Sequence, residues 1–346
     1  MWQGFIPPQK LYAGRSFLGI ALDPPNYNPG SWIGAGKALY LEDTGTILLT
    51  ARPRIAADDA RGYAANIYSS KNGVDFALIG SVTKELAAEL SGEKIHSIEG
   101  TQLLRDPLTG RWHFFISVDT GAEFAWGGVK WETLLLTSFN LEGPWRPEGL
   151  VLRNDKQYDE HQARDSTIDI VDGRWLCLYK AKDANRDERP ALAVSRDGVL
   201  WDKKGPLTVD GEDHVCFING GMFATSSGTM FIGIESRLDD SRSRRTNVVY
   251  ADEFGIGHGG GPPARFVAYL LDIRSMNLET VFNTQWQPLS QYEHDEHPLL
   301  GYSSTIFDRK NQRFLIYVEA LDPELTEAIG INSTVERLLV YESRTQ

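Results

Sequence analysis

Apolar and polar residues follow a pattern along this chain that repeats five times. Each copy has a short apolar run, a turn, and a second apolar run that ends in polar residues. Turn residues between two apolar runs are typical of a β-hairpin. The copies begin at Ile33, Ile98, Arg164, Ile218 and Gly301. The pattern therefore predicts five hairpins of the same kind.

The spacing of these hairpins leaves room for further strands between them. Their turn residues are Gly45, Gly110, Gly173, Gly228 and Gln312, which are 65, 63, 55 and 84 residues apart. Each interval can hold about four strands, the size of one propeller blade. Helical periodicity is confined to residues 83–90, whereas a parallel α/β fold needs many crossover helices. The sequence predicts an all-β fold, a single five-bladed β-propeller over residues 1–346 with a central funnel-shaped active site.

Equivalent positions of the repeats are expected to meet in the centre, because the first strand of each blade lines the central channel. Polar residues stand about eight or nine positions before each turn, if the longer turn RDPLTG of the second copy is allowed for: Lys37, Glu99, Asp165, Asn219, and Ser303 or Ser304. A second polar set stands seven positions after each turn: Arg52, Ser117, Lys180, Glu235 and Glu319. A buried charge must be hydrated, paired with an opposite charge, or used in binding or catalysis, because an isolated one is very costly. We expect a polar cavity, with salt bridges between adjacent blades as the alternative for any single residue.

Charge and composition narrow the class of partner. The net charge of −12 argues against a nucleic acid or an anionic membrane, because no basic block is present. No apolar run of about 18 residues and no leader-like N-terminus occur, so a cytoplasmic protein is expected, or a secreted one if a leader has been removed. Cys177 and Cys216 are expected to be buried thiols, with a disulfide as the alternative.

Histidines and tryptophans give weaker signals near the predicted funnel. Histidines precede the inner strand in four copies, at His96, His161, His214 and His297. Imidazole there could bind a sugar hydroxyl, tune a carboxylate or ligate a metal. Residues 294–297 lack the His-Glu-x-x-His spacing of zinc sites, so no metal and no cofactor are predicted, with an axial calcium ion as the alternative. Trp126 could stack on a sugar ring or pack against the next blade.

Three segments resemble the five-bladed propeller glycosidases, the group that contains glycoside hydrolase families 43, 32, 117 and 130. They are SIEGTQLLRDPLTGRWHFFIS, QARDSTIDIVDGRWLCLYKA and FIGIESR. The resemblance lies in the order and spacing of the strand segments of each blade. Carried over residue by residue, it implies that Asp165 orients the substrate and tunes the acid, and that Glu235 is the general acid. The first inner strand, GAGKALY, has no acidic residue, so the base is either Glu99 or Asp23.

The first blade, NPGSWIGAGKALYLEDTGTILLTARPR, looks more like that of family 130. That resemblance implies a catalytic role for Glu99 and substrate binding by Arg52 and Arg54. Family 130 includes phosphorylases, which need several cations around phosphate. Lys180 and Arg237 could add to the two arginines in that role.

The sequence as a whole predicts a glycoside hydrolase that uses acid/base chemistry on an oligosaccharide. We expect exo-action with inversion, whereas a short separation of the two carboxylates would give retention. Asn219, His161 and Glu319 are further candidates for substrate binding, because they occupy equivalent places in the repeats. The alternatives are a glycoside phosphorylase and a non-catalytic glycan-binding propeller. The oligomeric state stays open.

Overall fold

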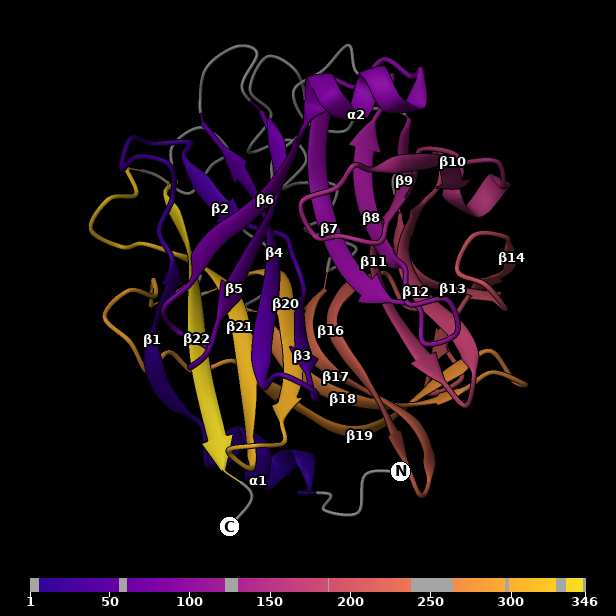
Figure 1. Cartoon of the computed structure of the whole chain (residues 1–346). Coiled ribbons are helices and arrows are strands. Elements are labelled where there is room, and N and C mark those ends of the chain that lie inside the picture. The colour runs from indigo at the N-terminus through magenta and orange to yellow at the C-terminus, as the bar shows by residue number, and fades with distance from the viewer. Residues whose placement is uncertain are drawn as a thin grey trace.

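The computed structural model describes residues 6–55, 61–121, 130–185, 187–237, 264–295, 299–327 and 334–344. In these ranges the chain is an all-β fold with two α-helices, α1 (Pro8–Ala13) and α2 (Lys84–Ser91). The two helices lie at opposite ends of the strands (Figure 1). The helix predicted at residues 83–90 is confirmed as α2, and the Thr83 side chain caps it by accepting a hydrogen bond from the Leu86 amide. No helix in the described ranges is long and apolar enough to cross a membrane.

The described strands form antiparallel sets of four, and in the first four sets each strand pairs with the next one along the chain. The sets are joined into sheets of nine, eight and five strands. The first set contains β3 (Ala38–Leu41), β4 (Thr46–Arg54), β5 (Ala64–Ser70) and β6 (Ala77–Thr83). The second contains β7 (Ser97–Arg105), β8 (Trp112–Asp119), β9 (Trp131–Ser138) and β10 (Arg146–Leu152). The third contains β11 (Gln162–Val171), β12 (Arg174–Lys182), β13 (Glu188–Ser195) and β14 (Trp201–Pro206).

The last set joins the two ends of the described chain. The fourth set contains β16 (Cys216–Thr225), β17 (Gly228–Arg237), β18 (Arg265–Asp272) and β19 (Asn277–Gln285). The fifth contains β20 (Leu299–Asp308), β21 (Arg313–Leu321), β22 (Glu336–Arg344) and β1 (Ser16–Leu22). Three short elements lie between sets: β2 (Trp32–Gly34), the 3₁₀ helix Gln157–Asp159 and β15 (Thr208–Val209). The first strand of the chain therefore completes the last set.

The predicted turn residues all adopt the left-handed conformation. Their φ angles are 62° for Gly45, 73° for Gly110, 74° for Gly173, 128° for Gly228 and 50° for Gln312. Glycine reaches this region without a steric penalty, which explains four of the five choices. Each residue lies at the turn between the first two strands of its set, with Gly228 as the first residue of β17, so the predicted hairpins are confirmed.

The first strand of each set, here called the inner strand, contacts the inner strands of two other sets. The contacts run from β3 to β7, β11, β16 and β20, and from β20 back to β3. All five inner strands also line one cavity of about 390 Å³. Its lining includes Tyr40, Gln102, Ile168, Met222 and Phe307. The inner strands thus surround a common space.

Apolar side chains fill the spaces between neighbouring sets. One buried cluster joins Leu11 of α1 to Phe266 and Trp286, and therefore ties the N-terminal helix to the fourth set. Cys177 and Cys216 are both buried and form no disulfide, which confirms that prediction.

Candidate active site

The five polar positions that precede the turns lie together in the structure. The Lys37 ammonium donates hydrogen bonds to the Asn219 side chain and, at 2.7 Å, to the Ser303 carbonyl oxygen. The Asn219 amide donates to the Asp165 carbonyl oxygen at 3.4 Å. The amide of Gly100, next to Glu99, donates to the Asp165 carboxylate at 3.0 Å. Five strand sets thus contribute to one polar centre.

Charged side chains gather at the end of the inner strands where β7 and β11 begin and β4 and β12 finish. We call this group the carboxylate–cation cluster, and its members are Arg52, Glu99, Arg164, Asp165, Lys180 and Tyr302. Arg52 forms an ion pair with Glu99. Arg164 lies between the two carboxylates, at 3.9 Å from Glu99 and 3.3 Å from Asp165. Lys180 is 2.7 Å from Asp165. All six side chains come from strands of four different sets.

Asp165 is held from several directions. Its carboxylate accepts a hydrogen bond from the Tyr302 hydroxyl at 3.0 Å, in addition to those from Gly100 and Lys180. Its backbone amide donates to the Ser117 hydroxyl at 2.9 Å. Its φ of 55° is unusual for a residue other than glycine, and such strain is concentrated at functional sites. The surroundings therefore fix one orientation of this carboxylate.

Three inner hairpins have irregular registers at the level of the cluster. The shifts lie between Ile98 and Thr101, between Arg164 and Thr167, and between Leu299 and Ser303. Each shift contains one cluster residue, namely Glu99, Asp165 or Tyr302. A β-bulge re-aims the side chain that it carries and is common beside active sites. The irregular registers are thus the local reason why these three side chains converge.

The charges of the cluster keep Asp165 ionised. Burial alone would raise the pKa of this carboxyl, but Arg164 and Lys180 outweigh burial and lower the pKa to about 2. Burial and the nearby carboxylates of Asp165 and Glu99 raise the pKa of Tyr302 well above its ordinary value. The phenol therefore stays protonated and can donate its hydrogen bond.

A second carboxylate pair lies behind Arg52. Burial raises the pKa of Glu319 to about 7 even though Arg52 lowers it, and Glu336 is a neighbouring carboxyl. Burial and Glu319 together raise the pKa of Glu336 well above the ordinary value. Two interacting buried carboxyls titrate as a pair. Burial, and then the like charge of Arg52, lower the pKa of Arg54 to about 9, and this guanidinium lies 3.9 Å from the centre of the Trp32 ring.

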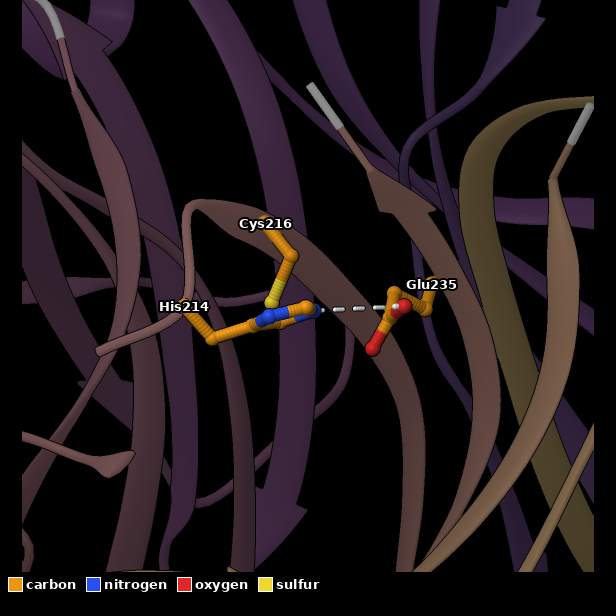
Figure 2. Close-up of side chains that lie close together, drawn as sticks. All are labelled: His214, Cys216 and Glu235. Carbon is orange, nitrogen blue, oxygen red and sulfur yellow. Dashed lines mark ion pairs between the residues drawn. The ribbon is translucent and has the colours of Figure 1, made fainter. Parts of the chain in front are cut away.

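Glu235 lies in a different group of side chains from Glu99 and Asp165. It is fully buried on β17, and the Tyr269 hydroxyl donates a hydrogen bond to its Oε2. His214 Nε2 is 3.6 Å from its Oε1. Figure 2 shows the side chains of His214, Cys216 and Glu235 pointing toward one another. These three donors are of types that bind metal ions.

The Glu235 group adjoins the cluster through an aromatic contact. Phe217 follows Cys216, and its ring centre lies 4.4 Å from the Lys180 ammonium and 5.3 Å from the centre of the Tyr302 ring.

The remaining predicted site residues lie elsewhere or outside the described ranges. Asp23 is exposed, and its carboxylate is 3.5 Å from Arg337, so the structure does not place it in the cluster. His161 is half-buried just before β11 and donates its backbone amide to the Lys182 carbonyl oxygen. Trp126 and His297 lie outside the described residues, as does the side chain of Arg237.

The sequence interpretation missed two members of the cluster. Arg164 directly precedes Asp165, and Tyr302 directly precedes Ser303. Counting back from the turns gives one position per repeat, and both residues fall one position away from it. A bulge shifts the register at just these places, so a window of two residues at each position would have included both.

None of the protein-family models matches this sequence, and no curated protein sequence matches it. Solved structures match over nearly the whole chain. A family 117 glycoside hydrolase from the marine bacterium Zobellia galactanivorans matches with a TM-score of 0.63 and 12% identity, over 97% of this chain and 92% of that one. A β-1,2-mannobiose phosphorylase from Listeria innocua matches with a TM-score of 0.54 and 12% identity, over 96% and 91%. A sucrose-6-phosphate hydrolase from Lactobacillus gasseri matches with a TM-score of 0.61 and 12% identity, over 92% of this chain and 60% of that one.

These matches are to the kind of protein that the sequence resembles. At 12% identity they bear on the fold and leave the chemistry to be argued from the site. The chain has the fold shared by these glycoside hydrolases and this phosphorylase, which confirms at the level of fold its resemblance to the propeller glycosidases.

Proposed function

We propose that this protein is a glycoside hydrolase, built as a five-bladed β-propeller, that cleaves an oligosaccharide at the carboxylate–cation cluster. The five strand sets, the contacts between their inner strands and the completion of the last set by β1 support this architecture. The observation that carries the function is the convergence of Glu99 and Asp165 from neighbouring sets, bridged by Arg164, in a fold shared with glycoside hydrolases.

The surroundings of the two carboxylates suit different roles. Asp165 stays ionised and is oriented by Lys180 and Tyr302, so it is suited to bind sugar hydroxyls and to stabilise the positive charge of an oxocarbenium-like transition state. Glu99 lies between the guanidinium groups of Arg52 and Arg164, which hold its carboxylate in place. A carboxylate positioned in this way can act as the general base that activates water.

Glu235 was predicted to be the general acid, and its surroundings give a reason to test that role separately. Its carboxylate belongs to the group formed with His214 and Cys216, apart from Glu99 and Asp165. The proposal therefore rests on Glu99 and Asp165, and Glu235→Gln enters the experiment as a separate variant.

The test is a screen of aryl glycosides and oligosaccharides, including furanosides and mannosides, with and without phosphate. We expect phosphate-independent sugar release that falls by about 10²- to 10⁴-fold in Glu99→Gln and in Asp165→Asn. Glu148→Gln, on the outer strand β10, is the matched control and should keep full activity. Inversion predicts that the first product seen by NMR has the anomeric configuration opposite to that of the substrate.

Two other outcomes would replace the proposal. Retention of activity in both carboxylate variants would remove the cluster from catalysis. Saturable binding of a glycan without any release would instead show a non-catalytic glycan-binding propeller, whose carboxylates serve only in ion pairs.

A glycoside phosphorylase is the second candidate, because two arginines lie close together on β4. Burial and the like charge of Arg52 lower the pKa of Arg54, and a phosphate ion beside them would relieve that repulsion. Sugar release that requires phosphate and is lost in Arg54→Gln would favour this candidate over hydrolysis.

A further inference from the structure

Three potential metal ligands lie together where β16 begins and β17 ends. His214 precedes β16, Cys216 is its first residue, and Glu235 lies near the end of β17. Within the part of the chain that the structure describes, one ligand atom from each of them lies within 4.8 Å of the others. Figure 2 shows the imidazole, the thiol and the carboxylate side by side.

The separation of these atoms fits a shared ion better than a direct contact. His214 Nε2 lies 3.6 Å from Glu235 Oε1, which exceeds the length of a hydrogen bond. This nitrogen is buried and has no hydrogen-bond partner among the described residues. Nitrogen and oxygen ligands each sit about 2.0–2.2 Å from a tetrahedral zinc ion, which puts them about 3.3–3.6 Å from each other. The observed distance matches that separation.

We propose that His214, Cys216 and Glu235 form a binding site for a divalent transition-metal ion, with zinc as the expected ion. Imidazole and thiolate are borderline and soft ligands that select zinc over magnesium or calcium, and a carboxylate oxygen is a third type of ligand that zinc accepts. The sequence interpretation noted that His214 could ligate a metal, but it predicted none because residues 294–297 lack the spacing of a zinc site. The ligands assigned here are separated along the chain and become neighbours through the pairing of β16 with β17.

The surroundings hold two of these ligands in place. The Tyr269 hydroxyl donates to Glu235 Oε2, which orients the carboxylate with Oε1 on the side of His214. Arg189 binds both carboxylate oxygens of Asp213, at 2.8 and 3.0 Å, and so fixes the segment that carries His214. Such secondary contacts orient the ligands of metal sites and tune their affinity.

The site would also act on the neighbouring cluster. Phe217 follows Cys216 and lies against both Lys180 and Tyr302, the two residues that orient Asp165. An ion on Cys216 fixes the start of β16 and with it this aromatic contact.

The metal site goes beyond the proposed hydrolysis and does not depend on it, because the ion can bind whatever the cluster does. It also assigns Glu235 a role as ligand, which excludes a role as general acid.

The test is metal binding by the full chain after chelator treatment in the presence of a reductant. Zn²⁺ is titrated against a chromophoric chelator, and Co²⁺ serves as a spectroscopic probe. We expect one ion per chain and a sulfur-to-cobalt charge-transfer absorption. Affinity should fall by at least about tenfold in Cys216→Ser, in His214→Gln and in Glu235→Gln, since each removes one of three ligands. Cys177→Ser, at the other buried cysteine, is the matched control and should bind as the wild type does.

Several results would overturn the site. They are the absence of stoichiometric zinc binding, a cobalt spectrum without the sulfur band, and equal affinity in wild type and His214→Gln. His214 is partly exposed, so this variant tests the ligand even if Cys216→Ser fails to fold. Metal binding is measured without any sugar, so its failure is distinct from a failure of the proposed hydrolysis. Loss of sugar release in Glu235→Gln, both with and without zinc, together with unchanged zinc affinity, would show an acid in place of a ligand.

Discussion

Glu319 shows how much the environment of a single residue can matter in this molecule. Burial raises its pKa from 4.5 to about 7, so the unfolded chain ionises this carboxyl at a lower pH than the folded chain does. The contribution to stability is fully present below pH 4.5 and is lost as the pH rises through about 7. A rise in pKa of this size corresponds to a free energy on the order of 3 kcal/mol.

Substitution of Glu319 tests this pH dependence. We expect Glu319→Gln to lose less stability than the wild type between pH 4.5 and pH 7, because glutamine has no charge to bury. The substitution also removes the repulsion between the carboxylates of Glu319 and Glu336. The measurement is the free energy of urea unfolding at several pH values in both proteins. Parallel pH profiles would show that the ionisation of Glu319 has no effect on stability.

Some residues of the site could be predicted from the sequence and others could not. Lys37, Glu99, Asp165 and Asn219 were predicted from their distance to the turns, and the structure brings them together. Asp23 was assigned from its closeness along the chain to the first inner strand, yet it is exposed beside Arg337. Register within a hairpin follows from counting residues, whereas the path of a connecting segment depends on packing that no local pattern encodes.

At the scale of the elements, strands could be predicted wherever a turn residue marked the connection between them. A left-handed turn requires glycine or a residue that tolerates positive φ, so the hairpins have a local signal in the sequence. The pairing of β1 with β22 has no such signal, because the two strands are separated by nearly the whole chain. The same holds for the contact between β16 and β20, which brings Ser303 to Asn219.

Gly173 offers a clean test of the turn requirement. Its φ is 74°, and a Cβ atom at this position would meet nothing within 4 Å, so strain alone sets the cost of substitution. We expect Gly173→Ala to lower the free energy of unfolding by about 1 kcal/mol and Gly173→Asn to cost less, because asparagine tolerates this conformation. Chemical denaturation measures both. Equal stability of all three proteins would mean that the turn adopts another conformation in solution.

At the scale of the whole molecule, the last strand set depends on residues from both ends of the chain. β22 comes from residues near the C-terminus, and β1 supplies its outer partner, with Ser16 opposite Glu342 and Ile20 opposite Leu339. The proposed propeller needs this pairing, because a set that lacks its outer strand exposes the edge of β22. Unpaired edge strands are prone to associate with other chains.

A chain that lacks residues 1–22 should therefore lose stability and self-associate, since it also loses the packing of Leu11 between α1 and the fourth set. A peptide of residues 14–24 added in trans should pair with β22 and restore a monomer, as peptides do when they add a strand to a sheet. The measurements are thermal unfolding and light scattering of the truncated chain with and without peptide.

The control is the same peptide with Ile20→Pro. Proline cannot donate the ladder hydrogen bond, so this peptide should not restore the truncated chain to a monomer. A truncated chain as stable and as monomeric as the wild type would show that the five sets hold together without this closure, and the proposed architecture would then have to rest on the contacts among the inner strands alone.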